Sequence, residues 1–139
     1  MNTKIEKIKV KFQGKPIEID IAKELSIREE TIQGQLISSP SSYYILCSIR
    51  DNYIKKRDKL ARDKDIAYSE AWTFYKDSNE RWNNDYVSHK ANTNHKYQSL
   101  YEQYLKACDK ANVFISLCKA YESREGILRT LNANLRKQQ

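Results

Sequence analysis

The chain has 139 residues and a net charge of +7, from 25 basic and 18 acidic side chains, with three Gly and two Pro. This length suits one domain, and so few turn-forming residues predict few, long elements, which excludes a fold of many short strands. The excess of positive charge favours a polyanionic partner such as nucleic acid, although a solvated helical surface that leans positive is the plain alternative.

Residues 5–21 predict a β-hairpin. Apolar residues alternate with lysine in the first half and with acids in the second half, and Gln-Gly-Lys-Pro at 13–16 provides the turn. Opposed charges across the strands would help to set the register. An isolated hairpin is marginal, so its apolar face must dock on the helices of the same chain or on a neighbouring subunit. We therefore expect an N-terminal hairpin at 1–21 and a helical oligomerisation and nucleic-acid-binding domain at 22–139.

A short helix is expected at 22–37, capped by Asp20. The Ser-Ser-Pro-Ser-Ser run at 38–42 is the clearest break in the chain. Ser39 would serve as N-cap and Pro40 as the first residue of the next helix.

The first long helix is expected at 41–77. Apolar residues recur there at three- and four-residue steps, and a cluster of cations lies around this stripe. Proteins usually hold single strands with cations along the phosphates and with aromatic rings that stack on the bases. Tyr53, Tyr68 and Trp72 lie near the basic cluster in the sequence and could supply such rings. We therefore take the basic cluster as the candidate nucleic-acid site. It comprises Arg50, Lys55, Lys56, Arg57, Lys59, Arg62 and Lys64.

Three of these cations, Arg50, Arg57 and Lys64, recur every seven residues. If they lie in the seam between helices, they must pair with acids such as Glu102, Asp109 or Glu122, because burial of an unpaired charge is costly. If they flank the seam, they form a ridge that is free for phosphate. The sequence leaves both possibilities open.

Residues 77–94 are a polar connection in which Ser88 could cap a short helix, and a second long helix follows from Lys96 to Gln139. It would span on the order of 60 Å, so it must lie against another long helix, in the same chain or in another copy. Its basic end, including Arg124, Arg129 and Arg136, suits the C-terminus of a helix dipole. Heptad-like spacing along its apolar stripe predicts the oligomerisation residues. These are Tyr97, Tyr101, Tyr104, Ala111, Phe114, Cys118, Tyr121, Leu128 and Leu131.

The sequence contains no convincing catalytic constellation, phosphate-binding glycine loop or metal-ligand spacing, so we expect no enzyme, cofactor or metal. His89 and His95 are expected to be ordinary surface residues. The three cysteines form no CxxC pair and are expected to be reduced and buried in a cytosolic protein. We expect neither a signal peptide nor a membrane span, because no apolar run approaches the ~18 residues that a span needs.

The order of these segments resembles the UvsY-like phage recombination mediators over roughly residues 25–136. The matching features are a helix entered at a Tyr pair (41–46), an A-x-x-x-A-x-x-x-Y stretch (67–75), a polar segment with S-x-x-K or a similar pattern (87–90) and a final helix with Arg-x-x-x-Leu (120–128). The N-terminal hairpin is not part of the family pattern. The family carries DNA-associated basic residues in the stretch matching 67–75. Here Ser69 and Ala71 are not basic, and the cations lie earlier, at 55–64.

The resemblance implies a mainly α, oligomeric protein, either a long-helix bundle or a helical hairpin. Such a protein would bind single-stranded DNA and help to load a strand-exchange recombinase onto DNA coated with single-strand-binding protein. It would work in the host cell cytoplasm if it is encoded by a phage. The alternative is a structural or adaptor coiled-coil protein that binds a protein partner without nucleic acid.

Overall fold

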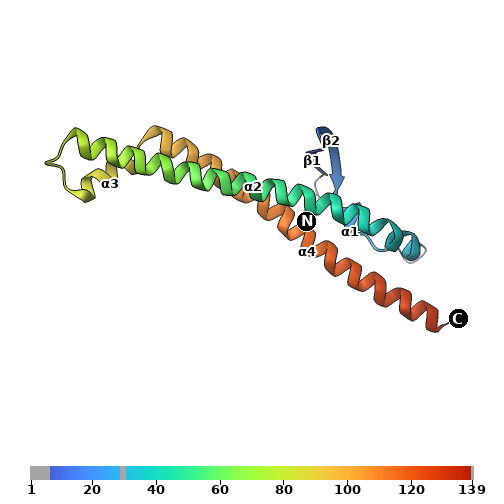
Figure 1. Cartoon of the computed structure of the whole chain (residues 1–139). Coiled ribbons are helices and arrows are strands. Elements are labelled where there is room, and N and C mark those ends of the chain that lie inside the picture. The colour runs from blue at the N-terminus through green and yellow to red at the C-terminus, as the bar shows by residue number, and fades with distance from the viewer. Residues whose placement is uncertain (1–6, 29–30, 139) are drawn as a thin grey trace, which may run out of the picture. The chain divides into compact units, whose positions relative to one another are not determined.

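The protein is mainly helical, with a two-stranded β-hairpin at its N-terminus (Figure 1). This computed structural model describes residues 7–28 and 31–138. The elements are β1 (Lys7–Phe12), β2 (Lys15–Asp20), α1 (Ile21–Leu25), α2 (Ile32–Ser78), α3 (Asn84–Asn92) and α4 (His95–Lys137). The expected fold class, long helices that follow an N-terminal hairpin, is confirmed.

The chain forms two compact units, each built from parts of both long helices. Unit 1 comprises Met1–Asp51 and Asn112–Gln139, and unit 2 comprises Asn52–Ala111. The hairpin that we expected as a separate segment at 1–21 therefore groups with the N-terminal part of α2 and the C-terminal part of α4. The candidate site and the expected oligomerisation residues are each divided between the two units.

The hairpin has the expected antiparallel register. Lys9 faces Glu18, and Lys7 lies opposite Asp20 while its ammonium group forms an ion pair with Glu18 at 3.5 Å. Gln13 and Gly14 form the tight turn with φ values of +51° and +77°, as a two-residue hairpin loop requires. Val10 and Ile19 are buried, so part of the apolar face is covered within the chain. Residues 5 and 6 of the expected hairpin lie outside the described residues.

The expected helix at 22–37 is wrong, because the chain leaves the helical path at Ser26. Asp20 caps α1 as predicted, and its carboxylate accepts a hydrogen bond from the Lys23 N–H at 3.2 Å. The Ser26 hydroxyl then donates to the Lys23 carbonyl at 2.8 Å while the Ser26 backbone is extended. A serine side chain that bonds to nearby backbone competes with continuation of the helix. Helix α2 begins only at Ile32.

The expected break at 38–42 is also wrong, because α2 continues through Pro40. Proline lacks an N–H, so one helical hydrogen bond is lost here. Contacts to α4 hold the helix together at this point. The Tyr121 hydroxyl donates to the Ser39 carbonyl at 3.5 Å, and Arg124 donates to the Ser39 hydroxyl at 3.4 Å. Ser39 is therefore a buried residue inside α2 and not an N-cap.

The connection between the long helices contains a short helix, α3, which begins before the residue we expected. Asn83 caps it by accepting a hydrogen bond from the Tyr86 N–H at 2.8 Å. Ser88 lies inside α3, where its hydroxyl accepts a hydrogen bond from the Trp72 indole N–H at 3.2 Å. This bond and the buried Val87 and Ala91 fix α3 against α2 within unit 2.

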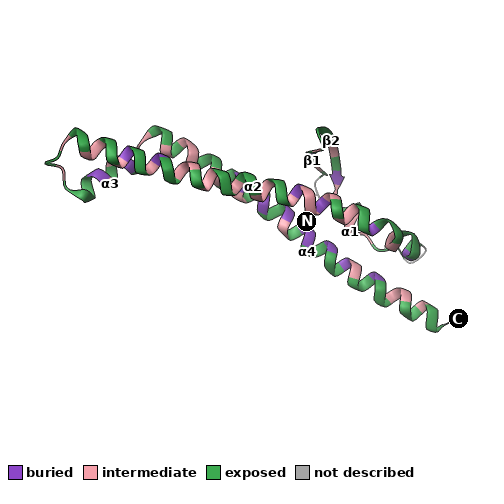
Figure 2. Ribbon diagram, viewed as in Figure 1, coloured by how far each residue is buried: buried purple, intermediate pink, exposed green. Residues whose placement is uncertain are grey.

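The buried residues differ in kind between the two units. Figure 2 marks the buried positions along the helices in purple. In unit 1, α4 buries large side chains, including Phe114, Tyr121 and Leu128. In unit 2, the buried positions of the long helices are alanines. These are Ala67 and Ala71 on α2 and Ala107 and Ala111 on α4. Alanine allows close approach of helices, and in unit 2 the aromatic rings pack around this seam, as in the edge-to-face contact of Tyr68 and Tyr97.

Candidate nucleic-acid interface

Four of the seven candidate cations are exposed on α2 in unit 2. They are Lys55, Lys56, Lys59 and Arg62. Lys55, Lys59 and Arg62 are spaced by four and three residues, so they share one face of the helix. An open depression is lined by these three cations together with Asp58 and Ala61. This face differs from the one that buries Ala67 and Ala71, and its cations can therefore reach a ligand without disturbing the packing.

The three cations at seven-residue spacing are partly buried and pair with the acid that follows each of them. Arg50 contacts Asp51 at 3.1 Å, Arg57 contacts Asp58 at 3.1 Å, and Lys64 contacts Asp65 at 2.8 Å. Their side chains are 28%, 29% and 16% exposed. These cations thus match neither alternative that the sequence left open. The ion pairs with Asp51, Asp58 and Asp65 lie along α2 rather than across the seam, and the three cations do not form a free ridge.

Lys64 is the most firmly held of the three. Its ammonium group lies 5.0 Å from the ring centre of Tyr104 and 6.0 Å from that of Tyr101. The hydrogen bond that the Lys64 ammonium group donates to the Asp65 carboxylate raises the pKa of Lys64, which keeps the group charged. Lys64 is therefore engaged within unit 2, and we assign it to packing rather than to ligand contact.

Two of the aromatic residues expected beside the basic cluster, Tyr68 and Trp72, also serve packing. Tyr68 makes an edge-to-face contact with Tyr97, and Trp72 donates its indole N–H to Ser88. Tyr97, Tyr101 and Tyr104 form a row of neighbouring rings along α4. These contacts stabilise unit 2.

A second aromatic group, which was not expected from the sequence, lies at the α2–α3 turn. Trp82 and Tyr86 make an edge-to-face contact, with ring centres 4.8 Å apart and planes at 73°. The Lys90 ammonium group lies 5.9 Å from the Trp82 ring centre and 5.8 Å from that of Tyr86. Spacing of four residues between these three side chains is the signal that could have revealed the group.

Most of the expected oligomerisation residues are covered within the chain. Ala111, Phe114, Cys118, Tyr121 and Leu128 are buried, Tyr97, Tyr104 and Leu131 are half-buried, and Tyr101 is 38% exposed. The heptad-like stripe therefore explains packing of α4 inside one chain.

Arg124 has a different place from the one expected. It does not lie at the basic end of α4 but is buried in unit 1, where it is 7% exposed. Its guanidinium group donates to the Ser26 carbonyl at 3.1 Å, to the Ser39 hydroxyl at 3.4 Å and to Glu125 at 2.8 Å. It also lies over the Tyr121 ring, 4.9 Å from its centre.

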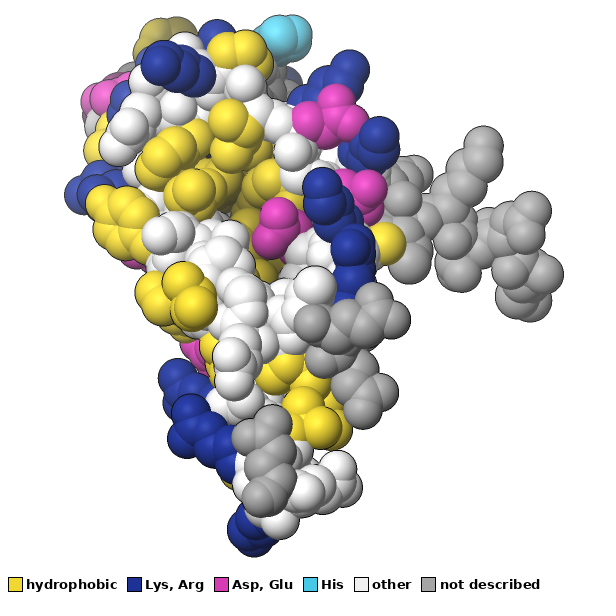
Figure 3. Space-filling view, turned by 90° about the vertical axis from the view of Figure 1, so that its right-hand side faces the viewer, with side chains coloured by type: hydrophobic (Ala, Val, Ile, Leu, Met, Phe, Trp, Pro, Cys, Tyr) yellow, Lys and Arg dark blue, Asp and Glu magenta, His cyan; other side chains and the backbone are white. Residues whose placement is uncertain are grey.

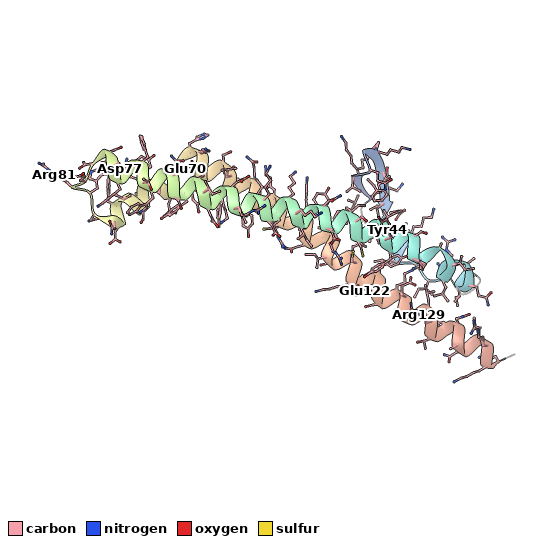
Figure 4. The ribbon with its side chains drawn as sticks, viewed as in Figure 1. Tyr44, Glu70, Asp77, Arg81, Glu122 and Arg129 are labelled. Carbon is pink, nitrogen blue, oxygen red and sulfur yellow. The ribbon has the colours of Figure 1, made fainter. Side chains whose placement is uncertain are left out.

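A pocket of about 360 Å³ lies beside this buried group in unit 1, lined by Ser39, Pro40, Tyr43, Glu122, Glu125 and Arg129. The Tyr43 hydroxyl donates a hydrogen bond to Glu122, which raises the pKa of Tyr43. Figure 4 shows Glu122 and Arg129 on α4. Both signs of charge line this pocket, so it is not a simple anion site.

The cysteines and histidines form no recognised site. Cys118 is buried as expected, whereas Cys47 and Cys108 are only half-buried, and all three are free thiols. His89 and His95 are exposed. Among residues 7–28 and 31–138, no group of three or more His, Cys, Asp or Glu side chains is placed to hold a metal ion. None of the described helices is long and apolar enough to span a membrane.

Comparison of the chain with models of protein families, with curated proteins and with solved structures found no match. The candidate interface therefore depends on its own geometry. On the face drawn in Figure 3, Lys and Arg side chains lie at several separate places and do not form one continuous patch.

Proposed function

We propose that this protein binds single-stranded DNA as a homo-oligomer and acts as a recombination mediator. In this role it would help to load a strand-exchange recombinase onto DNA coated with single-strand-binding protein. The observation that carries the proposal is the exposed face of α2 that bears Lys55, Lys59 and Arg62. These side chains project from the helix on a different side from its packed residues. The resemblance to UvsY-like mediators supplies the specific role.

The exposed cations on this face of α2 suit the phosphates of a nucleic acid strand better than a single protein carboxylate held in a defined pocket. Lys55 and Arg62 are separated by about 10 Å along the helix, so a single chain would contact few phosphates. Binding of this kind is weak for one copy and becomes strong when several linked copies hold the same strand. Self-association is thus the second half of the proposal, and it would use surfaces other than the buried stripe of α4.

A mediator of this kind needs no reaction of its own. It would hold the strand by its phosphates while single-strand-binding protein leaves and the recombinase enters. We therefore propose a non-enzymatic protein that works without a cofactor, in the cytoplasm of an infected cell if a phage encodes it.

A second candidate function is that of an adaptor that binds a protein partner. The observation that favours it is the presence of large apolar side chains on the surface of unit 2. Ile66 and Phe74 on α2 are 56% and 66% exposed, and Leu105 on α4 is 46% exposed. A partner helix could cover such residues, and nucleic acid would then play no part.

Light scattering with and without oligo-dT tests both candidates, combined with fluorescence anisotropy of labelled oligo-dT at about 50 mM salt. We expect a particle several times the 16.4 kDa of one chain, and binding that weakens as salt rises. Oligomers that ignore oligo-dT would favour the adaptor. A single subunit that does not bind the strand would overturn the proposal.

A further inference from the structure

The side chains of Trp82, Tyr86 and Lys90 form a fixed aromatic and cationic group in unit 2. The two rings touch edge to face, and the same ammonium group lies near both ring centres. Tyr86 is 42% exposed and Trp82 is half-buried. Unlike Trp72, whose indole N–H is bonded to Ser88, these rings stand at the surface of the turn that joins α2 to α3.

The backbone beneath these rings is held at several points. Lys76 on α2 donates a hydrogen bond to the Trp82 carbonyl at 2.8 Å, and Asn83 caps the helix that carries Tyr86. Asn79 accepts a hydrogen bond from the Arg81 N–H at 3.1 Å. A ring that is already fixed loses little conformational entropy when a ligand stacks on it.

The same turn is aligned with the exposed basic face of α2. Lys55, Arg62, Ser69 and Lys76 follow one another at seven-residue steps, so they lie along one stripe with a drift of about 20° per step. Lys76, which holds the Trp82 carbonyl, is thus at the end of this stripe, about 21 Å along the axis from Arg62. A strand that follows the stripe would arrive at the aromatic group.

The charges around the aromatic group cancel. Three cations and three acids lie between residues 76 and 90, namely Lys76, Arg81 and Lys90 with Asp77, Glu80 and Asp85. Arg81 points away from the turn into solvent (Figure 4). The group therefore offers little net attraction to phosphates, and what it presents to a ligand is aromatic surface.

We propose that Trp82 and Tyr86 form a stacking platform for unpaired bases of single-stranded DNA whose phosphates lie along Lys55, Lys59 and Arg62. This inference rests on the proposed function and adds to it a second contact of different chemistry. Stacking accepts any base because every base has an aromatic face. It gives the protein a preference for strands with accessible bases, which charge alone cannot provide.

The test compares two ligands with the same number of phosphates, oligo-dT and an abasic oligomer. The wild-type protein binds oligo-dT more tightly, and Trp82→Ala weakens oligo-dT binding roughly tenfold while changing abasic binding less than about twofold. Trp82→Phe restores most of the preference. Phe74→Ala, which removes an exposed ring outside the platform, serves as the matched control and leaves the preference intact.

Tryptophan fluorescence gives a second readout that does not depend on the alanine variant folding. The protein has two Trp, so loss of the oligo-dT quenching in Trp82→Phe assigns it to Trp82. Equal binding of both oligomers by the wild type, or quenching that persists in Trp82→Phe, would overturn the platform while leaving strand binding in place. Failure of the wild type to bind either oligomer would instead refute the proposed function, and the platform with it.

Discussion

The guanidinium group of Arg124 donates a hydrogen bond to the carbonyl oxygen of Ser26, a residue 98 positions earlier in the chain. Ser26 lies directly after α1, where the backbone leaves the helical path and its carbonyl lacks a helical partner. The same guanidinium group bonds to Ser39 on α2. One side chain of α4 thus fixes two segments of the N-terminal half of unit 1.

We expect Arg124→Ala to destabilise the protein by about 2–3 kcal/mol, because it removes hydrogen bonds to buried groups and leaves Glu125 without its cation. The loss would be measured as a lower urea midpoint. Arg129→Ala changes an exposed arginine five residues further along α4 and is expected to shift the free energy of unfolding by less than about 0.5 kcal/mol. Equal effects of the two substitutions would contradict the role given to Arg124.

Pro40 gives a separate test of how unit 1 is held together. Because Pro40 lies inside α2, Pro40→Ala restores a helical hydrogen bond, and we expect it to stabilise the protein by about 1–2 kcal/mol after the entropy lost from the unfolded state is subtracted. If a helix began at this proline instead, the substitution would be neutral or destabilising. Thermal unfolding followed by circular dichroism distinguishes these outcomes.

The hairpin and the long helices could be predicted from sequence because each follows a local period. Lysine alternates with apolar residues at 7–12, and three- and four-residue steps extend through most of α4. The exposed position of Lys55, Lys59 and Arg62 could also have been derived, since this spacing places them away from the packed stripe.

Other features could not be predicted because they depend on residues far apart in the chain. Nothing near Pro40 indicates that Tyr121 and Arg124 will hold the helix through it. A buried arginine looks the same in sequence as a solvated one, so the sequence alone predicts that Arg124 belongs with the cations at the end of the last helix. The acid that follows each of Arg50, Arg57 and Lys64 can be read from the sequence, so these ion pairs could have been predicted. The partial burial of the three cations could not, because it depends on the packing of the helix.

Cys118 should make stability depend on pH in the alkaline range. Burial raises the pKa of this thiol from its ordinary value of 9.0 to about 11. Between pH 9 and 11 the Cys118 thiol loses its proton in the unfolded chain but keeps it in the folded chain. The contribution of Cys118 to the free energy of unfolding is therefore fully present below pH 9 and is lost as pH rises towards 11. We expect urea midpoints to decline over this range in the wild type and to decline less in Cys118→Ala, compared with each protein's own value at pH 7.5.

Reactivity of the thiols provides a check on the same residue. At pH 8 an aromatic disulfide reagent should modify Cys47 and Cys108 faster than Cys118, because only Cys118 is fully buried and its thiolate is disfavoured. Modification of Cys118 should require unfolding. Rapid reaction of all three thiols in the native protein would show that Cys118 is accessible.

Reversal of the exposed basic face provides the strongest test of how the strand is held. Lys55→Glu, Lys59→Glu and Arg62→Glu together lower the net charge from +7 to +1, since each reversal removes two units. If these side chains contact three phosphates, the slope of log affinity against log salt should become about 2 less steep, at roughly 0.7 for each contact with a single strand. The fold should survive, because all three side chains are exposed and point away from the packed face.

The matched control reverses three exposed lysines on α4, Lys106, Lys110 and Lys119, and produces the same net charge. A general effect of charge would weaken oligo-dT binding equally in both variants, whereas a defined contact would spare the control. We expect the α2 variant to lose most of its affinity at about 50 mM salt and the α4 variant to keep a salt slope close to that of the wild type. Equal loss in the two variants would mean that the strand has no preferred path along α2.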